Sequence, residues 1–274
     1  MARIKDYDLI KKIGEDGMGA VYLAEHISTG KKFAVKTILG EIASDNNRWL
    51  VDRFEHKFRS QARLDHPNIV TTTDFIKEKD SLYMVMEYID GLTLDRLIME
   101  QGALEENLAL GITKDILRGL NYAHGQGVIH WNMKPSNIIV SKTGIVKVMD
   151  FGSAVLFREL SKVTIEEPLW TRLFPPHYMT PEQITRPREI DHRTNVYSMG
   201  IVMYEMLSGQ VPFNADSEFG IYTQHVQEPT PDIRKFRPEI SATLWGIINK
   251  ALEKRPDDRF VSCGEMLEYI EAYE

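Results

Sequence analysis

Cysteine is almost absent from the 274-residue sequence, which contains only Cys263. A single cysteine excludes an intrachain disulfide framework and a cluster of thiolates around a metal, and we interpret Cys263 as a small apolar core residue. Long hydrophobic runs are also missing, because no stretch of about 18 apolar residues occurs. Residues 1–5 (MARIK) become polar at once, which argues against a signal peptide. The sequence therefore predicts a cytoplasmic location and no membrane segment within this chain.

Positively charged residues are also fewer than negatively charged ones. The 33 Lys and Arg residues are outnumbered by 40 Asp and Glu residues, which gives a net charge of -7. This balance argues against binding nucleic acid or an anionic membrane through net charge. Apolar residues make up 43% of the sequence and charged residues 27%, which is enough to bury a full core in two lobes or one large domain.

The expected secondary structure divides the chain into two parts. Up to residue 86, short β-type runs alternate with turn residues, and we expect strands at 7–13, 20–25, 32–38, 71–76 and 82–86. One helical stretch, at about 47–64, interrupts them. From residue 93 onward helical patterns dominate, and an apolar face over 108–123 is ended by Gly125. Residues 195–208 are apolar nearly all round and precede Gly209, which predicts a buried central helix.

Four motifs with chemical content follow one another along the sequence. They are a glycine-rich loop at 14–21 (GEDGMGAV), a strand ending in lysine at 33–36 (FAVK), a loop at 130–137 (HWNMKPSN) and the triplet 150–152 (DFG). Supporting segments are 66–70 (HPNIV), 85–88 (VMEY), 178–183 (YMTPEQ), 196–200 (VYSMG) and 255–260 (RPDDRF). In this order and register, the chain resembles the bacterial Hanks-type serine/threonine protein kinases over residues 7–270.

The resemblance implies an α+β, bilobal protein-kinase fold. The small lobe, residues 1–86, would hold an antiparallel sheet with one main helix, and the larger, mostly helical lobe would span 92–274. Between them we expect the hinge at 87–91, where strand patterns give way to helical ones. The glutamate and arginine that such kinases bury as an ion pair in the large lobe match Glu182 and Arg259.

The resemblance also implies a site for ATP with Mg²⁺. Lys36 matches the lysine that pairs with the α- and β-phosphates, and Asn137 and Asp150 match the two metal-ligand positions. Lys134 matches the catalytic lysine that neutralises charge on the transferring phosphoryl group. The other implied nucleotide-binding positions are Gly14, Asp16, Gly17, Gly19, Val21, Ala34, Met86, Glu87, Tyr88 and Ile139.

The catalytic loop departs from the family pattern at two neighbouring positions. Asn132 stands where these kinases have the aspartate that accepts the proton of the substrate hydroxyl. A carboxamide can orient a hydroxyl but cannot take its proton at neutral pH, and a general base contributes roughly 10² to 10⁴ in rate. Trp131 replaces the arginine that many relatives use to clamp a phosphorylated activation segment. We expect a buried ring at Trp131, with His130 packing against Phe151.

The phosphate-binding region carries two changes of opposite charge. Asp16 replaces the second glycine of the loop, and its carboxylate brings like charge to a triphosphate. Lys57 occupies the position of the helix glutamate that pairs with Lys36, and two facing lysines repel each other. We expect the Asp16 carboxylate to point toward Lys36, Lys57 or both, with Asp150 as its main competitor. ATP binding should therefore be weak or absent.

Two further departures lie in the large lobe. Pro175 stands where the family has the threonine whose hydroxyl helps to dock the substrate residue. Asn195 replaces the aspartate that holds the backbone of the catalytic loop, although its oxygen can still accept hydrogen bonds. Because these changes lie in separate elements, we interpret them as natural loss of activity.

Our first interpretation is a pseudokinase, a catalytically impaired protein-binding module with a regulatory or scaffolding role. It predicts no phosphate transfer above background, even after Asn132→Asp. The alternative is a low-activity serine/threonine protein kinase that transfers the γ-phosphate of MgATP to a protein hydroxyl, supported by Lys36, Lys134, Asn137 and Asp150. A third possibility is nucleotidyl transfer with an inverted nucleotide, which only the altered glycine loop favours.

The expected partners are proteins, and the expected contact surface is the apolar segment 151–178. Trp170 and Phe174 are the candidate anchors, since aromatic side chains dominate interface energies. Alternatively, either ring packs into the core of this chain.

Overall fold

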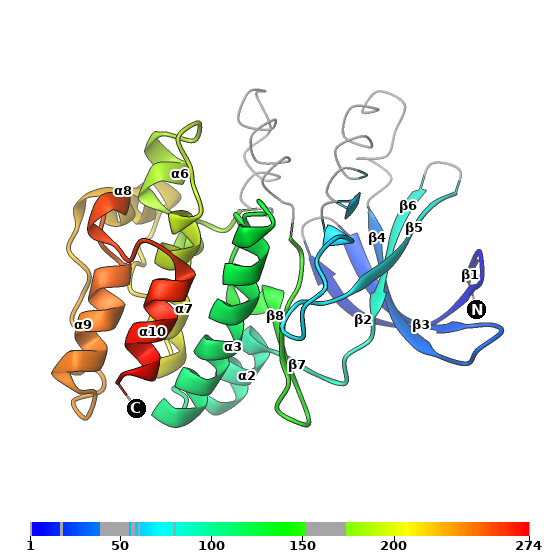
Figure 1. Ribbon diagram of the computed structural model, residues 1–274, viewed down its shortest axis with the longest axis horizontal. Coiled ribbons are helices and arrows are strands. Elements are labelled where there is room, and N and C mark those ends of the chain that lie inside the picture. Colours follow the sequence, from blue (N-terminus) through cyan, green and yellow to red (C-terminus); the bar gives the residue numbers. More distant parts are fainter. Residues whose placement is uncertain are drawn as a thin grey trace.

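The computed structural model describes residues 2–16, 19–38, 55, 58–59, 61–78, 81–151 and 174–273. Strands gather at one end of the molecule and helices at the other, so that the chain forms a small sheet lobe and a larger helical lobe (Figure 1). This arrangement is the bilobal fold that the sequence predicts. No helix among these residues is both long enough and apolar enough to span a bilayer.

The small lobe is built on an antiparallel sheet with strand order β1-β2-β3-β4-β6-β5. The strands are β1 (Arg3–Ile4), β2 (Tyr7–Asp16), β3 (Gly19–His26), β4 (Lys32–Ile38), β5 (Thr72–Glu78) and β6 (Ser81–Glu87). Ala24, Val35 and Val85 have no exposed surface and form the centre of one sheet face. On the other face, Val70, Met84 and Met86 form a buried cluster against which Phe58 packs. Glu55, Phe58, Arg59 and Gln61 are helical.

A second, three-stranded sheet lies where the lobes meet. It consists of β7 (Gly91–Thr93), β8 (Ile138–Ser141) and β9 (Val146–Val148). Backbone hydrogen bonds join β9 to the segment that leads into β5: Val70 N donates to Val148 O at 2.8 Å, and Val148 N donates to Asn68 O at 2.9 Å. These bonds fix the residues after β9 directly beneath the small lobe.

The large lobe packs around one central helix, α7 (Arg193–Ser208), in which nearly every residue is buried. Gly209 ends this helix in the left-handed conformation, with φ of 75°, as glycine allows without strain. The other helices are α2 (Leu94–Gln101), α3 (Glu106–Gly125), α6 (Pro181–Thr185), α8 (Glu218–Gln227), α9 (Ala242–Ala251) and α10 (Cys263–Glu271). Short 3₁₀ turns are η2 (Pro135–Asn137), η3 (Pro176–Tyr178), η4 (Ile233–Lys235) and η5 (Pro256–Asp258).

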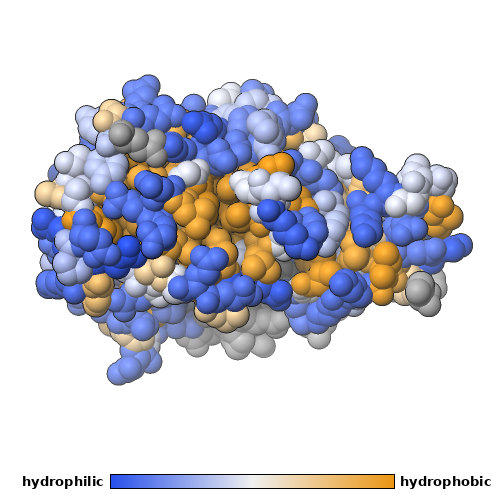
Figure 2. Space-filling model, turned by 90° about the horizontal axis from the view of Figure 1, so that it is seen from below, coloured by the Kyte–Doolittle hydropathy of each residue, from blue (hydrophilic) through white to orange (hydrophobic). Residues whose placement is uncertain are grey.

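The surface carries some large apolar side chains on both lobes. Figure 2 shows one face, on which apolar side chains form patches separated by hydrophilic ones. The most exposed are Phe219 at 79% and Met99 at 78%. Others are Ile10, Ile27, Leu108, Ile145, Phe236, Val261 and Tyr269.

Candidate active site

One face of the small sheet gathers several predicted site residues. Val21 pairs with Lys36 across β3 and β4, and Ala34 pairs with Met86 across β4 and β6. Directly opposed residues of antiparallel strands share a face, as do residues two apart along a strand. Val21, Ala34, Lys36 and Met86 therefore lie on the same face of the sheet.

The glycine-rich loop has a structural requirement of its own at Gly19. A Cβ atom added there would lie 1.9 Å from the carbonyl oxygen of Thr37, so only glycine allows this approach of β3 to β4. At Gly14 an added Cβ would make an ordinary contact, 3.8 Å from Val21 Cβ. Gly17 and the side chain of Asp16 lie outside the described residues, so the predicted inward turn of Asp16 stays a prediction.

Lys36 and Asp150 form a buried ion pair that crosses from one lobe to the other. The Lys36 Nζ atom lies 2.7 Å from Asp150 Oδ2, and the two side chains are 3% and 12% exposed. Asp150 lies two residues after the end of β9 and has a left-handed backbone conformation, with φ of 67°. The structure thus joins the expected phosphate-binding lysine to an expected metal ligand. Lys57, the other predicted neighbour of Lys36, lies outside the described residues.

His130 anchors the start of the catalytic loop. Its Nε2 atom donates to Met149 O at 2.8 Å. Its ring packs edge-on against that of Phe151, with the ring centroids 4.7 Å apart, which is the predicted packing. Its backbone N–H donates to Asn195 Oδ1 at 3.1 Å. Asn195 therefore still holds the loop through its oxygen, as the sequence suggests.

The carboxamide of Asn137 is oriented by the loop itself. Its Nδ2 atom donates to Asn132 O at 2.7 Å, and the backbone carbonyl of Asn137 accepts Met149 N at 2.9 Å. Since the amide nitrogen is committed to the loop, the oxygen is the atom that could face a cation. One carboxylate at Asp150 and one amide oxygen at Asn137 suit Mg²⁺, which binds one or two protein oxygens and completes its shell with water and phosphate. Asn132 and Lys134 are half-buried in the same loop.

Trp131 is buried, at 4% exposure, as predicted for a ring in place of arginine. Its backbone is left-handed, with φ of 62°, and its carbonyl accepts Nε2 of Gln183 at 2.7 Å. The sequence reasoning did not identify Gln183 as a site residue. Nothing in its sequence pattern indicates that this side chain reaches the catalytic loop.

The predicted hinge begins at a side chain that is already engaged. Glu87 Oε1 accepts Thr71 N at 2.7 Å and lies 2.6 Å from Lys147 Nζ. Its carboxylate is therefore committed to the protein, and its backbone N–H donates to Thr71 O at 3.0 Å. Tyr88 and Ile139, two further predicted nucleotide contacts, are half-buried.

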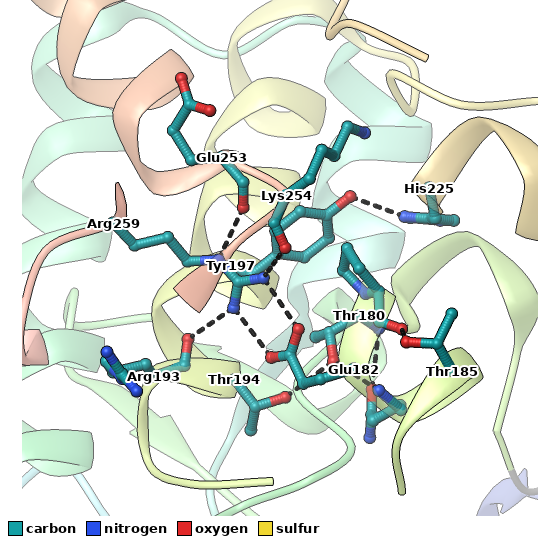
Figure 3. A network of polar contacts seen from close by, with 12 residues as sticks. Thr180, Glu182, Thr185, Arg193, Thr194, Tyr197, His225, Glu253, Lys254 and Arg259 are labelled. Carbon is teal, nitrogen blue, oxygen red and sulfur yellow. Dashed lines mark hydrogen bonds and ion pairs between the residues drawn. The ribbon is translucent and has the colours of Figure 1, made fainter. Parts of the chain in front are cut away.

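The predicted ion pair between Glu182 and Arg259 is present and buried (Figure 3). Two parallel bonds of 2.8 Å join the guanidinium to the carboxylate. The same guanidinium donates to the carbonyls of Glu253, Lys254 and Arg193 at 2.7, 3.0 and 3.2 Å. This set of bonds ties α6 to the start of α7 and to the loop before α10.

A half-buried carboxyl, Glu205, was not predicted. The Tyr178 hydroxyl donates to its Oε2 atom at 2.9 Å. Burial raises the pKa of Glu205 to about 7, and the bond from Tyr178 only partly offsets this shift. Burial also raises the pKa of Tyr178 far above its usual value.

The predicted partner segment, 151–178, is described only at Phe151 and at 174–178. Phe174 is 2% exposed, so its ring lies inside the chain. Trp170 lies outside the described residues. The role of either ring as an anchor for a partner stays a prediction.

The protein kinase domain model matches residues 7–269. The serine/threonine-protein kinase PrkC of Bacillus subtilis is 36% identical over 260 residues, covering 95% of this chain and 39% of that protein. The chain spans about two fifths of the length of the curated relatives it matches.

Solved structures of protein kinases share the fold. Rad53 1-466 in complex with AMP-PNP has a TM-score of 0.79 and 27% identity, covering 97% of this chain and 66% of that one. The PknI kinase domain of Mycobacterium tuberculosis has a TM-score of 0.76 and covers 100% of this chain and 98% of its own. At 24% identity, the second likeness is evidence of the fold alone.

Proposed function

The chain belongs to the protein kinase domain family, and from this premise we propose that it is a slow serine/threonine protein kinase. It would transfer the γ-phosphate of MgATP to a hydroxyl of a protein substrate. Curated relatives such as PrkC bear the name serine/threonine-protein kinase, which supports this alternative better than the pseudokinase interpretation. The observation that carries the proposal is the buried approach of Lys36 to Asp150 at 2.7 Å, which brings the expected phosphate-binding lysine to an expected metal ligand.

The proposed binding step uses residues that the fold has already gathered. Lys36 would bind phosphate oxygens, while Asp150 and Asn137 would hold Mg²⁺. The metal would supply positive charge to the phosphate oxygens as negative charge builds up on them. Because Lys36 is paired with Asp150, nucleotide must replace that contact, and this cost supports weak binding.

The proposed transfer step is slow because of Asn132. Phosphoryl transfer depends mainly on positioning and charge stabilisation, so some rate survives without a base. The Asn132 carboxamide can orient the hydroxyl but leaves its proton to water. We therefore expect a rate about 10² to 10⁴ below that of an aspartate-containing site.

The second candidate remains the pseudokinase, which Asn132 itself favours. In this case nucleotide binding would serve regulation, and the protein would act through partners. The segment around Trp170 is the proposed contact, and Trp170→Ala is expected to reduce partner recovery. An active kinase needs a supply of ATP, so we propose a cytoplasmic location.

Two measurements separate the candidates. The first is the melting temperature with and without MgATP, which rises when the native state binds nucleotide. The second is incorporation of labelled phosphate into a pooled library of serine- and threonine-containing peptides. Lys36→Ala is the control in both measurements. Each melting temperature with MgATP is compared with that of the same variant without MgATP.

The kinase proposal expects slow incorporation that is lost in Lys36→Ala and rises by about 10² in Asn132→Asp. A MgATP-dependent rise in melting temperature without incorporation by either protein would support the pseudokinase instead. No response to MgATP at all would overturn the nucleotide site.

A further inference from the structure

Gln183 is buried, with 5% of its surface exposed, and both ends of its carboxamide are bonded. Its Oε1 atom accepts the backbone N–H of Thr180 at 2.9 Å, and its Nε2 atom donates to Trp131 O at 2.7 Å. The first partner can only donate and the second can only accept, so the orientation of the amide is fixed. One side chain thereby joins the start of α6 to the catalytic loop.

The bond between Gln183 and Thr180 has a local explanation. Thr180 caps α6 and accepts Gln183 N through its hydroxyl, so the two residues form a capping box. A capping box needs only an acceptor at this position, and glutamate serves it as well as glutamine. The bond from Nε2 to Trp131 is outside the box, and a glutamate carboxylate could not make it.

The carbonyl that receives this bond belongs to a strained residue. Trp131 has φ of 62°, a left-handed conformation that is unfavourable for a non-glycine residue. The peptide that follows it carries Asn132. The bond from Gln183 to the Trp131 carbonyl and the bond from Asn132 N to His130 O at 2.8 Å together set the direction in which the backbone presents Asn132.

The catalytic loop is bonded to α7 on its other side. Asn195 Oδ1 accepts His130 N at 3.1 Å, and the hydroxyls of Thr194 and Thr180 lie 2.9 Å apart. Figure 3 shows Thr194 beside Thr180, at the start of α6. The hydrogen bonds and chain neighbours thus form a closed ring through α6, α7 and the loop.

Two prolines in the segment before Thr180 bring no hydrogen-bond donor to the catalytic loop. Pro175 and Pro176 have no backbone N–H and no polar side-chain atom. Their carbonyls accept Tyr178 N and Met179 N at 3.2 Å each, within the segment itself.

We propose that Gln183 is a positioning residue that ties the segment 174–180 to the catalytic loop and sets the place of Asn132. A protein substrate or partner that displaces this segment would act on the loop through the same bond. The expected effect on phosphate transfer rests on the proposed kinase function. The contact between Gln183 and the catalytic loop can be tested without measuring kinase activity.

The test is Gln183→Glu, which keeps the acceptor for Thr180 N and removes the donor to Trp131 O. At about pH 8 the new carboxylate would face a carbonyl. We expect amide hydrogen exchange in residues 130–137 to become about tenfold faster, with α9 and α10 unchanged. At about pH 5.5 a buried glutamate is protonated and can donate again, so protection should return toward that of the unmodified protein at the same pH.

Matched variants separate this tie from general stability. Gln183→Met removes both bonds and should speed exchange at both pH values. Gln61→Glu alters another buried glutamine, in the small lobe, and should leave residues 130–137 unchanged. Unchanged exchange in these residues in Gln183→Glu, or equal loss of protection throughout the large lobe, would overturn the proposal.

An activity measurement adds a second readout. In the Asn132→Asp protein, Gln183→Glu should lower kcat about tenfold at about pH 8, with the Kd for MgATP unchanged and recovery at lower pH. Equal effects on kcat and Kd would contradict a positioning role. If the Asn132→Asp protein transfers no phosphate, the proposed kinase function is wrong. The hydrogen-exchange measurement still tests whether Gln183 holds the catalytic loop.

Discussion

At the scale of single residues, Glu205 shows how strongly this interior can alter a side chain. It belongs to α7, and its bonding partner Tyr178 belongs to η3, on the segment that leads to α6. Because burial raises the pKa of this carboxyl to about 7, it is protonated in the folded protein under mildly acidic conditions. An unfolded glutamate loses its proton near its ordinary pKa of 4.5.

This difference makes stability depend on pH in a definite direction. Between the two pKa values the folded protein binds the proton that the unfolded chain has released, so stability falls as pH rises from about 4.5 to about 7. Glu205→Gln stays neutral and its oxygen still accepts from Tyr178. We expect it to raise the free energy of unfolding by on the order of 2 kcal/mol at about pH 8 and to have much less effect near pH 5.

Urea unfolding of both proteins across this pH range measures the effect. Glu100→Gln, on the exposed face of α2, is the control and should leave the pH profile unchanged. A gain from Glu205→Gln that is equal at all pH values would contradict the explanation.

At the scale of elements, the network around Arg259 determines how α6 is held. A buried pair is strongly destabilised when one partner is removed, because the other charge stays in the interior. We expect Arg259→Met to lower the free energy of unfolding by about 3 to 5 kcal/mol. Arg186→Met breaks only an exposed contact with Glu189 and should cost less than about 1 kcal/mol.

Chemical denaturation compares the two variants directly. Adding Glu182→Met to Arg259→Met should recover part of the loss, since the isolated carboxylate is then gone. If both arginine substitutions lower the free energy of unfolding equally, the buried network stabilises the protein no more than an exposed ion pair does.

The elements also show what the sequence could and could not predict. The long strands and α7 were predictable because alternating or all-round apolar patterns extend over many residues. The strands β1 and β7 to β9 were missed, because two to four residues are too few to show a period. Motif order was enough to anticipate that Lys36 and Asp150 share a site. The contacts of Gln183 with Trp131 and of Tyr178 with Glu205 depend on packing between distant segments, which no local pattern encodes.

At the scale of the whole molecule, the two lobes are joined in several places. The backbone bonds of β9 to the segment before β5 form one connection, and the side-chain contact of Lys147 with Glu87 forms another. The buried pair of Lys36 and Asp150 forms a third. We therefore expect the lobes to unfold together rather than as independent units.

The pair of Lys36 and Asp150 also bears on the order of events in folding. Its members are 114 residues apart in the sequence, so a long loop must close before they meet, and such contacts tend to form late. We expect Lys36→Met to speed unfolding while leaving the folding rate almost unchanged, as for a contact absent from the transition state. Stopped-flow folding and unfolding in urea measures both rates, with the exposed pair of Lys142 and Asp90 as the control. If folding slows instead, the lobes meet early, and the closed site is part of the folding nucleus.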